Sequence, residues 1–280
     1  MIRTKKQKAG TFITAIVLII LGAFMFLPIY LTIVMSLKPQ EELFVFPPKL
    51  YTLRPVLDNF RNMFDLLDNS RVPFSRYLFN SIAVTFIVTF LQYVFVSMGA
   101  FVLAKCTFPG GKLINSVIVT ALLYQSNVIY IMQYAVMSEM GIIDTPLALI
   151  LPSIASPMGL FLMKQSISQM PDAIIESAKI DGAGLFRICW QIVIPNQKPA
   201  LMTLIIFAFQ ASWNLQGGNL VFQEQYKTLP VVITQISSSG IARAGETMAA
   251  SVFMLIPPVI VFMLAQRHVI DTMAHSGIKN

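Results

Sequence analysis

Charged side chains are scarce in this sequence. Asp, Glu, Lys and Arg together make up 12% of its 280 residues, and the mean hydropathy is +0.71. A soluble domain usually carries about 25% charged residues, because its surface must stay hydrated. The low charge therefore argues against an ordinary water-soluble domain and favours a protein that folds in lipid.

Cysteine, histidine and catalytic motifs are also sparse. The two cysteines, Cys106 and Cys189, cannot form a disulfide scaffold, and we expect both to be reduced. The two histidines, His268 and His275, are too few to hold a metal ion. The sequence has no H-E-x-x-H or G-x-S-x-G motif. These absences argue against a membrane enzyme and against a resident metal; a membrane scaffold is a further, disfavoured, alternative.

A nucleotide-binding loop is absent as well. The only stretch close to G-x-x-x-x-G-K-[ST], residues 108–113, lacks the first glycine and lacks a hydroxyl after Lys112. We therefore expect no ATP or other cofactor to bind this chain. The net charge of +7 does not indicate nucleic acid, because no basic cluster is interleaved with aromatic residues outside the apolar runs.

Long apolar runs are what the sequence has instead. A helix of about 20 residues crosses a ~30 Å hydrocarbon layer. Six stretches are candidates: 11–37, 77–104, 114–136, 147–163, 200–220 and 247–266. The first is longer than the apolar region of a secretory signal, and no cleavage motif follows it, so we expect it to be retained. The sequence predicts an all-α, polytopic membrane protein with six transmembrane helices.

The distribution of basic residues predicts the orientation. The segments 1–10 and 267–280 and the loops 105–113 and 164–199 share one side, and this side carries twelve basic residues against four acidic ones. The opposite side carries eight basic and nine acidic residues, mostly in the long segment 38–76. Because basic loops stay in the cytoplasm, both termini and the 164–199 loop are predicted to be cytoplasmic.

The external segment 38–76 is too polar to span the membrane but has a helical pattern. Leu57, Phe60, Phe64 and Leu67 recur at helical spacing, which predicts a short amphipathic helix on the outer face. Two roles stay open for this helix: packing at the membrane interface, or contact with an external partner.

The longest cytoplasmic loop contains the most patterned polar stretch, ESAKIDGAGLFRICWQIVIP, at residues 176–195. Asp172 suits the start of a helix, where the helix dipole favours negative charge. Gly182 is expected to end this helix in a left-handed conformation, and a second helix is expected over about 185–192. Pro195 is expected to block its continuation. The shape alone fits either a plain structured loop or a compact two-helix projection with a function.

This loop resembles the signature loop of the inner-membrane permease subunits of ATP-binding-cassette importers. The family pattern is E-x-A, three residues, G, nine residues, I-x-x-P, and it is met by Glu176, Ala178, Gly182, Ile192 and Pro195. Two positions depart slightly from the pattern: Ser177 stands where alanine is usual, and Ile194 stands where leucine is common.

Further motifs resemble the carbohydrate-uptake branch of this family, the relatives of the second maltose permease subunit. They are Asn80-Ser81 at the start of the second span, Trp213-Asn214 in the fifth, and Thr228-Leu229-Pro230 after it. The tail departs from the usual G…G-x-K-G, because Asp271 occupies the first position and the chain ends Gly277-Ile278-Lys279-Asn280. The resemblance runs over about residues 77–280 and identifies a class rather than a solute.

The resemblance implies a type I importer permease in the bacterial cytoplasmic (inner) membrane, with a five-span core at 77–266. It implies a homologous second permease subunit, two ATPase subunits that hold ATP and Mg, an external solute-binding protein, and a carbohydrate solute, which we expect to be an oligosaccharide. In such importers the cytoplasmic loop is a coupling helix that sits in a groove of the ATPase. The resemblance assigns this contact to Glu176, Ser177, Ala178, Asp181, Gly182, Ala183, Arg187 and Pro195.

Polar side chains in the third and fifth spans indicate a path for the solute. Amide, hydroxyl and aromatic groups suit a neutral sugar, and the candidates are Tyr124, Asn127, Trp213 and Asn214. Such groups also join helices to each other in lipid, so this second role stays open for each of them. No acid or base lies well inside a span, which argues against the alternative function of an ion-gradient-driven carrier or channel without an ATPase.

The predicted orientation can be tested by labelling in sealed vesicles. A Lys179→Cys variant should react with a membrane-impermeant maleimide only in inside-out vesicles, and natural Cys189 is a second possible target. A Glu41→Cys variant in the external segment is the control and should react only in right-side-out vesicles. Labelling of position 179 from the outside alone would contradict the cytoplasmic placement of the loop.

Overall fold

The computed structural model describes residues 5–47, 49–68, 72–123, 126–217 and 220–276. Every regular element in these ranges is helical, which confirms the all-α prediction. They form two compact units: residues 1–70 with 233–255, and residues 71–232 with 256–280. The side chains of His268, Asp271 and His275 lie outside the described residues, as do the last four residues of the tail.

Four helices are long and apolar enough to cross a membrane: α1 (Lys5–Ser36), α4 (Phe74–Lys105), the pair α7 (Pro146–Ile154) and α8 (Pro157–Ser168), and α14 (Ala244–Ser276). A fifth candidate is α12 (Lys198–Trp213), which meets the preceding helical stretch at an 88° bend. The predicted third span corresponds to two shorter helices, α5 (Gly111–Ala121) and α6 (Ser126–Glu139). The short elements are α2 (Gln40–Leu43), α3 (Asp58–Asp68), η2 (Glu224–Tyr226), α13 (Leu229–Ser238) and η3 (Ile241–Arg243).

The predicted end of the fifth span was wrong by about two turns. Helix α12 ends at Trp213, whereas the apolar run had predicted residue 220. Past the helix, the backbone at Gly217 lies so close to Leu149 that a Cβ atom at this position would overlap the leucine side chain. Leu220 and Val221 are then buried as part of an irregular segment, so their hydrophobicity reflects packing rather than a span.

The first unit contains the predicted amphipathic helix of the external segment, α3. Its buried face is formed by Asn59, Met63 and Leu67, so the prediction of Leu57 as a face residue was wrong. Asn59 donates from Nδ2 to the carbonyl oxygens of Ser36 (2.9 Å) and Lys38 (2.7 Å), which would otherwise be unsatisfied at the end of α1. A polar residue was needed on the inner face because a helix end is buried there.

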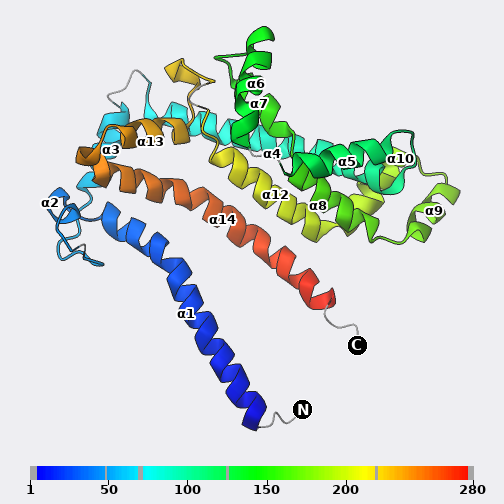
Figure 1. Ribbon diagram of the computed structural model, residues 1–280, viewed down its shortest axis with the longest axis horizontal. Helices are drawn as coiled ribbons and strands as arrows, with labels where there is room; N and C mark the ends of the chain where they lie inside the picture. The colour runs from blue at the N-terminus through cyan, green and yellow to red at the C-terminus, as the bar shows by residue number, and fades with distance from the viewer. Residues whose placement is uncertain (1–4, 48, 69–71, 124–125, 218–219, 277–280) are drawn as a thin grey trace. The chain divides into compact units, whose positions relative to one another are not determined.

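The second unit is built around α4. This helix packs against α8, α12 and α7, and Figure 1 shows α4, α8 and α12 running side by side. Helix α8 approaches α12 closely at Gly159, where a Cβ atom would lie 2.5 Å from the Leu204 side chain. One large apolar cluster fills this region, with Phe101 from α4, Met163 from α8 and Leu204 from α12 at most 3% exposed.

Candidate functional site: the 172–195 loop and a polar network at the start of α4

The first half of the 172–195 loop is the helix α9 (Asp172–Ile180), close to its predicted limits. Gly182 has φ +80°, the left-handed conformation that the sequence predicted. Its N–H donates to the carbonyl of Lys179, and the N–H of Ala183 donates to that of Ala178, both at 3.0 Å. This pair of bonds is a Schellman motif, which ends a helix and satisfies its last carbonyls.

The second half of the loop is longer than predicted. Its helical turns run without a gap from α10 (Leu185–Arg187) through a π-helical stretch (Ile188–Val193) to α11 (Ile194–Asn196). The prediction that Pro195 ends this helix was therefore wrong. The N–H of Ile194 bonds to the carbonyl of Cys189, five residues back, and such a widened turn accommodates a residue that lacks an N–H.

The sequence pattern allowed a compact two-helix projection, but the second half of the loop does not project freely. Ile188 and Val193 are fully buried and Cys189 is 3% exposed, all within the apolar cluster of α4, α8 and α12. Trp190 packs edge-on against Tyr93 of α4, with ring centroids 5.5 Å apart. The second half of the loop is thus a layer of the core. Because Cys189 is covered, sided labelling must rely on the Lys179→Cys variant.

Helix α9 rests on this layer, and most of the predicted contact residues of the loop are exposed. Those exposed are Glu176, Ser177, Asp181, Gly182, Arg187 and Pro195, whereas Ala183 is half-buried. Ala178 is only 6% exposed and packs into the apolar cluster, so the expectation that its small side chain faces a partner groove was wrong. Its size instead lets α9 approach the core closely.

Four exposed apolar side chains on the loop were missed by the sequence reasoning. The exposed fractions are 40% for Ile174, 86% for Ile180, 52% for Leu185 and 69% for Phe186. We call these four residues the apolar patch of the loop. Exposed apolar side chains that gather in one loop favour a contact with a partner. The sequence signal was their occurrence in an otherwise polar segment.

The solute-path candidates are only partly visible. Tyr124 and the side chain of Asn127 lie outside the described residues. Trp213 is 2% exposed and its ring stacks on Phe209 with centroids 6.0 Å apart, which makes it a packing residue within this chain. Asn214 is exposed at the end of α12, where its Nδ2 donates to the carbonyl of Gln210 at 3.0 Å.

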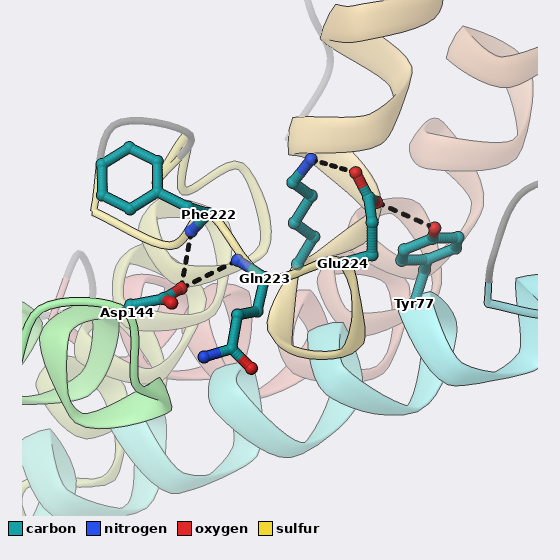
Figure 2. A network of polar contacts seen from close by, with 6 residues as sticks. Tyr77, Asp144, Phe222, Gln223 and Glu224 are labelled. Atoms are coloured by element: carbon teal, nitrogen blue, oxygen red, sulfur yellow. Dashed lines mark hydrogen bonds and ion pairs between the residues drawn. The ribbon is translucent and has the colours of Figure 1, made fainter.

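The opposite end of α4 carries a polar network with the segment 220–229 (Figure 2). The hydroxyl of Tyr77 donates to Glu224 at 3.1 Å, and Lys227 forms an ion pair with the same carboxylate. Asn80 donates to the carbonyls of Gln225 (2.8 Å) and Lys227 (2.9 Å). The Ser81 hydroxyl accepts the N–H of Leu229 at 2.7 Å. The segment is thus tied along the first turns of α4.

A second attachment of this segment is made by Asp144 (Figure 2). One carboxylate oxygen accepts the backbone N–H groups of Phe222 and Gln223, both at 2.8 Å. The hydrogen bond from the backbone N–H of Gln223 is the largest effect on the Asp144 carboxyl, and it lowers the pKa below the ordinary value of 3.8. The bond from Phe222 also lowers this pKa, whereas partial desolvation raises it. Because the folded-state pKa is depressed, this attachment is intact at neutral pH and is lost only as the pH falls below the ordinary aspartate range.

The sequence matches a known protein family. Residues 77–275 match the family model described as "Binding-protein-dependent transport system inner membrane component". The chain belongs to this family of importer permeases. The match covers more than half of the sequence and includes both the 172–195 loop and the polar network at the start of α4.

Named relatives extend along nearly the whole permease. It is 29% identical to the sn-glycerol-3-phosphate transport system permease protein UgpE of Yersinia enterocolitica, over 94% of this chain and 95% of the relative. It is 28% identical to the arabinooligosaccharides transport system permease protein AraQ of Bacillus subtilis, over 90% of each chain. A crystal structure of a bacterial ABC transporter that imports the acidic polysaccharide alginate has the same fold, with a TM-score of 0.77, 19% identity, and 95% and 99% of the two chains covered.

The polar network at the start of α4 gives a structural reason for two of the motifs that carried the resemblance. Asn80 and Ser81 of the N-S pair hold the backbone around Thr228-Leu229-Pro230, and Leu229 is 1% exposed. Asp144, Glu224 and Lys227 were missed from the sequence. The long-range contacts of Asp144 and Glu224 join residues 78 to 147 positions apart, so no local pattern marks them.

Removal of the Asp144 carboxylate should loosen the 220–229 segment. In an Asp144→Ala variant, the amides of Phe222 and Gln223 lose a charged acceptor, and their hydrogen exchange at neutral pH should accelerate by at least about fivefold. Exchange measured by mass spectrometry on peptides that cover 220–227 checks this. Glu139→Ala removes an exposed carboxylate five residues earlier and should leave these peptides unchanged; equal exchange in all three proteins would contradict the assignment.

Proposed function

We propose that this permease subunit forms the translocation path of an ATP-driven importer for a carbohydrate, with an oligosaccharide as the expected solute. It works with a homologous second permease, two ATPase subunits and an external solute-binding protein. The observation that carries the proposal is the coupling loop, in which a family motif coincides with an exposed apolar patch on α9 and α10. The relatives named for arabinooligosaccharides and for alginate support the carbohydrate class.

The coupling contact is made by two kinds of side chain. The apolar patch of Ile174, Ile180, Leu185 and Phe186 supplies buried area once it is covered by the ATPase. Exposed polar residues around it, Glu176 and Arg187 among them, add charge-assisted hydrogen bonds that fix the orientation. Gly182 contributes through the sharp turn between α9 and α10, since its φ of +80° is strained for other residues.

The solute path follows the polar residues of the third and fifth spans. Asn214 is exposed on the described surface and offers an amide to a sugar hydroxyl, whereas Trp213 supports it from the packed side. Tyr124 and Asn127 complete the proposed set. A neutral lining fits an uncharged solute, and the free energy for import then comes from the ATPase partners rather than from an ion gradient.

The coupling role can be tested at Ile180, whose side chain is 86% exposed and makes little internal contact. Burial of an isoleucine side chain contributes about 1.5 to 3 kcal/mol, so Ile180→Asp should reduce co-purification of the ATPase and solute uptake by at least about tenfold. Leu53→Asp, at a 67% exposed leucine in the external segment, is the matched control. Co-purification and uptake at control levels in Ile180→Asp would refute the coupling contact.

A further inference from the structure

Lys105, the last residue of α4, reaches the start of α9. Its ammonium donates to the backbone carbonyl of Met170 at 2.5 Å and to the carboxylate of Asp172 at 2.6 Å. These two acceptors flank Pro171, the N-cap residue of α9, so Lys105 holds the backbone just before the helix and the side chain of its first residue. The contact joins residues 67 positions apart in sequence.

The burial of Lys105 distinguishes it from a surface ion pair. Its side chain is 6% exposed, although that of Asp172 is 75% exposed. A buried ammonium is costly unless its hydrogen bonds are satisfied, so the lysine is held in this geometry by both of its partners. Exposed ion pairs contribute little to stability because water and salt screen them. In this pair the lysine is covered, so its end is shielded from the solvent.

The other buried contacts of α9 have a different character. Ile175 and Ala178 sit in the apolar cluster, where dispersion and hydrophobic contacts favour proximity but not a particular direction. A helix held by apolar contacts alone can slide or rotate on the layer beneath it. The two hydrogen bonds of Lys105 are directional and fix the first turn of α9 to the end of α4.

We propose that Lys105 is a positioning residue for energy coupling. It locks α9 to α4, so that a displacement of α9 by the ATPase moves α4 as a rigid body. Helix α4 has 32 residues, or about 48 Å of helix at ~1.5 Å per residue, and its far end holds the 220–229 segment. A displacement at the loop is thereby delivered across the membrane. This inference rests on the proposed function, since it assumes an ATPase bound at α9.

The test uses the complete importer assembled with its ATPase subunits and binding protein, purified and placed in vesicles. Lys105→Met removes the ammonium but keeps the length of the side chain, and the apolar patch remains in place. We expect the ATPase to co-purify as with the natural chain, while solute transported per ATP hydrolysed falls by at least about tenfold. Lys105→Arg keeps the charge and donors and should restore most of the ratio.

A matched control is Lys112→Met, which removes an exposed lysine from the first turns of α5 on the same predicted side. It should leave the transport-to-ATP ratio unchanged. A role confined to folding would lower the yield of assembled importer but not this ratio, which is normalised to the complex present. A natural ratio in Lys105→Met would overturn the inference and leave the ATPase contact, tested at Ile180, untouched.

A second variant tests the role of Lys105 if Lys105→Met does not accumulate in the membrane. Asp172→Asn removes one charge from the exposed end of the pair, which does not threaten the fold. It should lower the same ratio by a smaller factor, about two- to fivefold, because Lys105 retains its bond to Met170. No change in the ratio for Asp172→Asn, with the natural amount of assembled importer, would overturn the inference by this route.

Discussion

The buried apolar cluster that joins the second half of the coupling loop to α4, α8 and α12 is the contact on which the account depends. Residues 188–194 are packed into this cluster rather than displayed on the surface. A loop that only touched the membrane bundle could bend when a partner pushes on it. Because packed interiors deform little and switch between discrete arrangements, a push on this loop is passed to three helices at once.

Helix α4 connects the two ends of the second unit. At one end its Asn80 and Ser81 hold the backbone of the 220–229 segment, and at the other end it packs beneath the coupling loop. The first attachment pairs polar groups that a helix in lipid cannot leave unpaired, since a buried polar group without a partner is costly. The second is apolar packing. In the proposed orientation, α4 therefore relates an external event to a cytoplasmic one.

The sequence predicted those features that follow from local or periodic signals. Apolar length located α1, α4 and α14, and the conformational freedom of glycine located the turn at Gly182. Prediction from the sequence failed where contacts with a distant segment decide where a helix ends or which way a side chain faces. Pro195 remains inside a helix because a π-helical turn precedes it, Ala178 faces inward because of the layer beneath α9, and α12 stops at Trp213 where Gly217 meets Leu149. Lys105 carried no local pattern at all, because its acceptors lie 65 and 67 residues further along the sequence.

The most direct test of the central claim is a distance measured between the coupling loop and α4 during the ATPase cycle. Spin labels at Ser177→Cys on α9 and Val102→Cys on α4, with Cys106 and Cys189 replaced by alanine, report this distance in the assembled importer; both labelled positions are exposed. If the loop is part of the packed core, the distance should stay the same with and without trapped ATP. A shift of more than about 2 Å between the two states would show that α9 moves independently of α4 and would contradict the account.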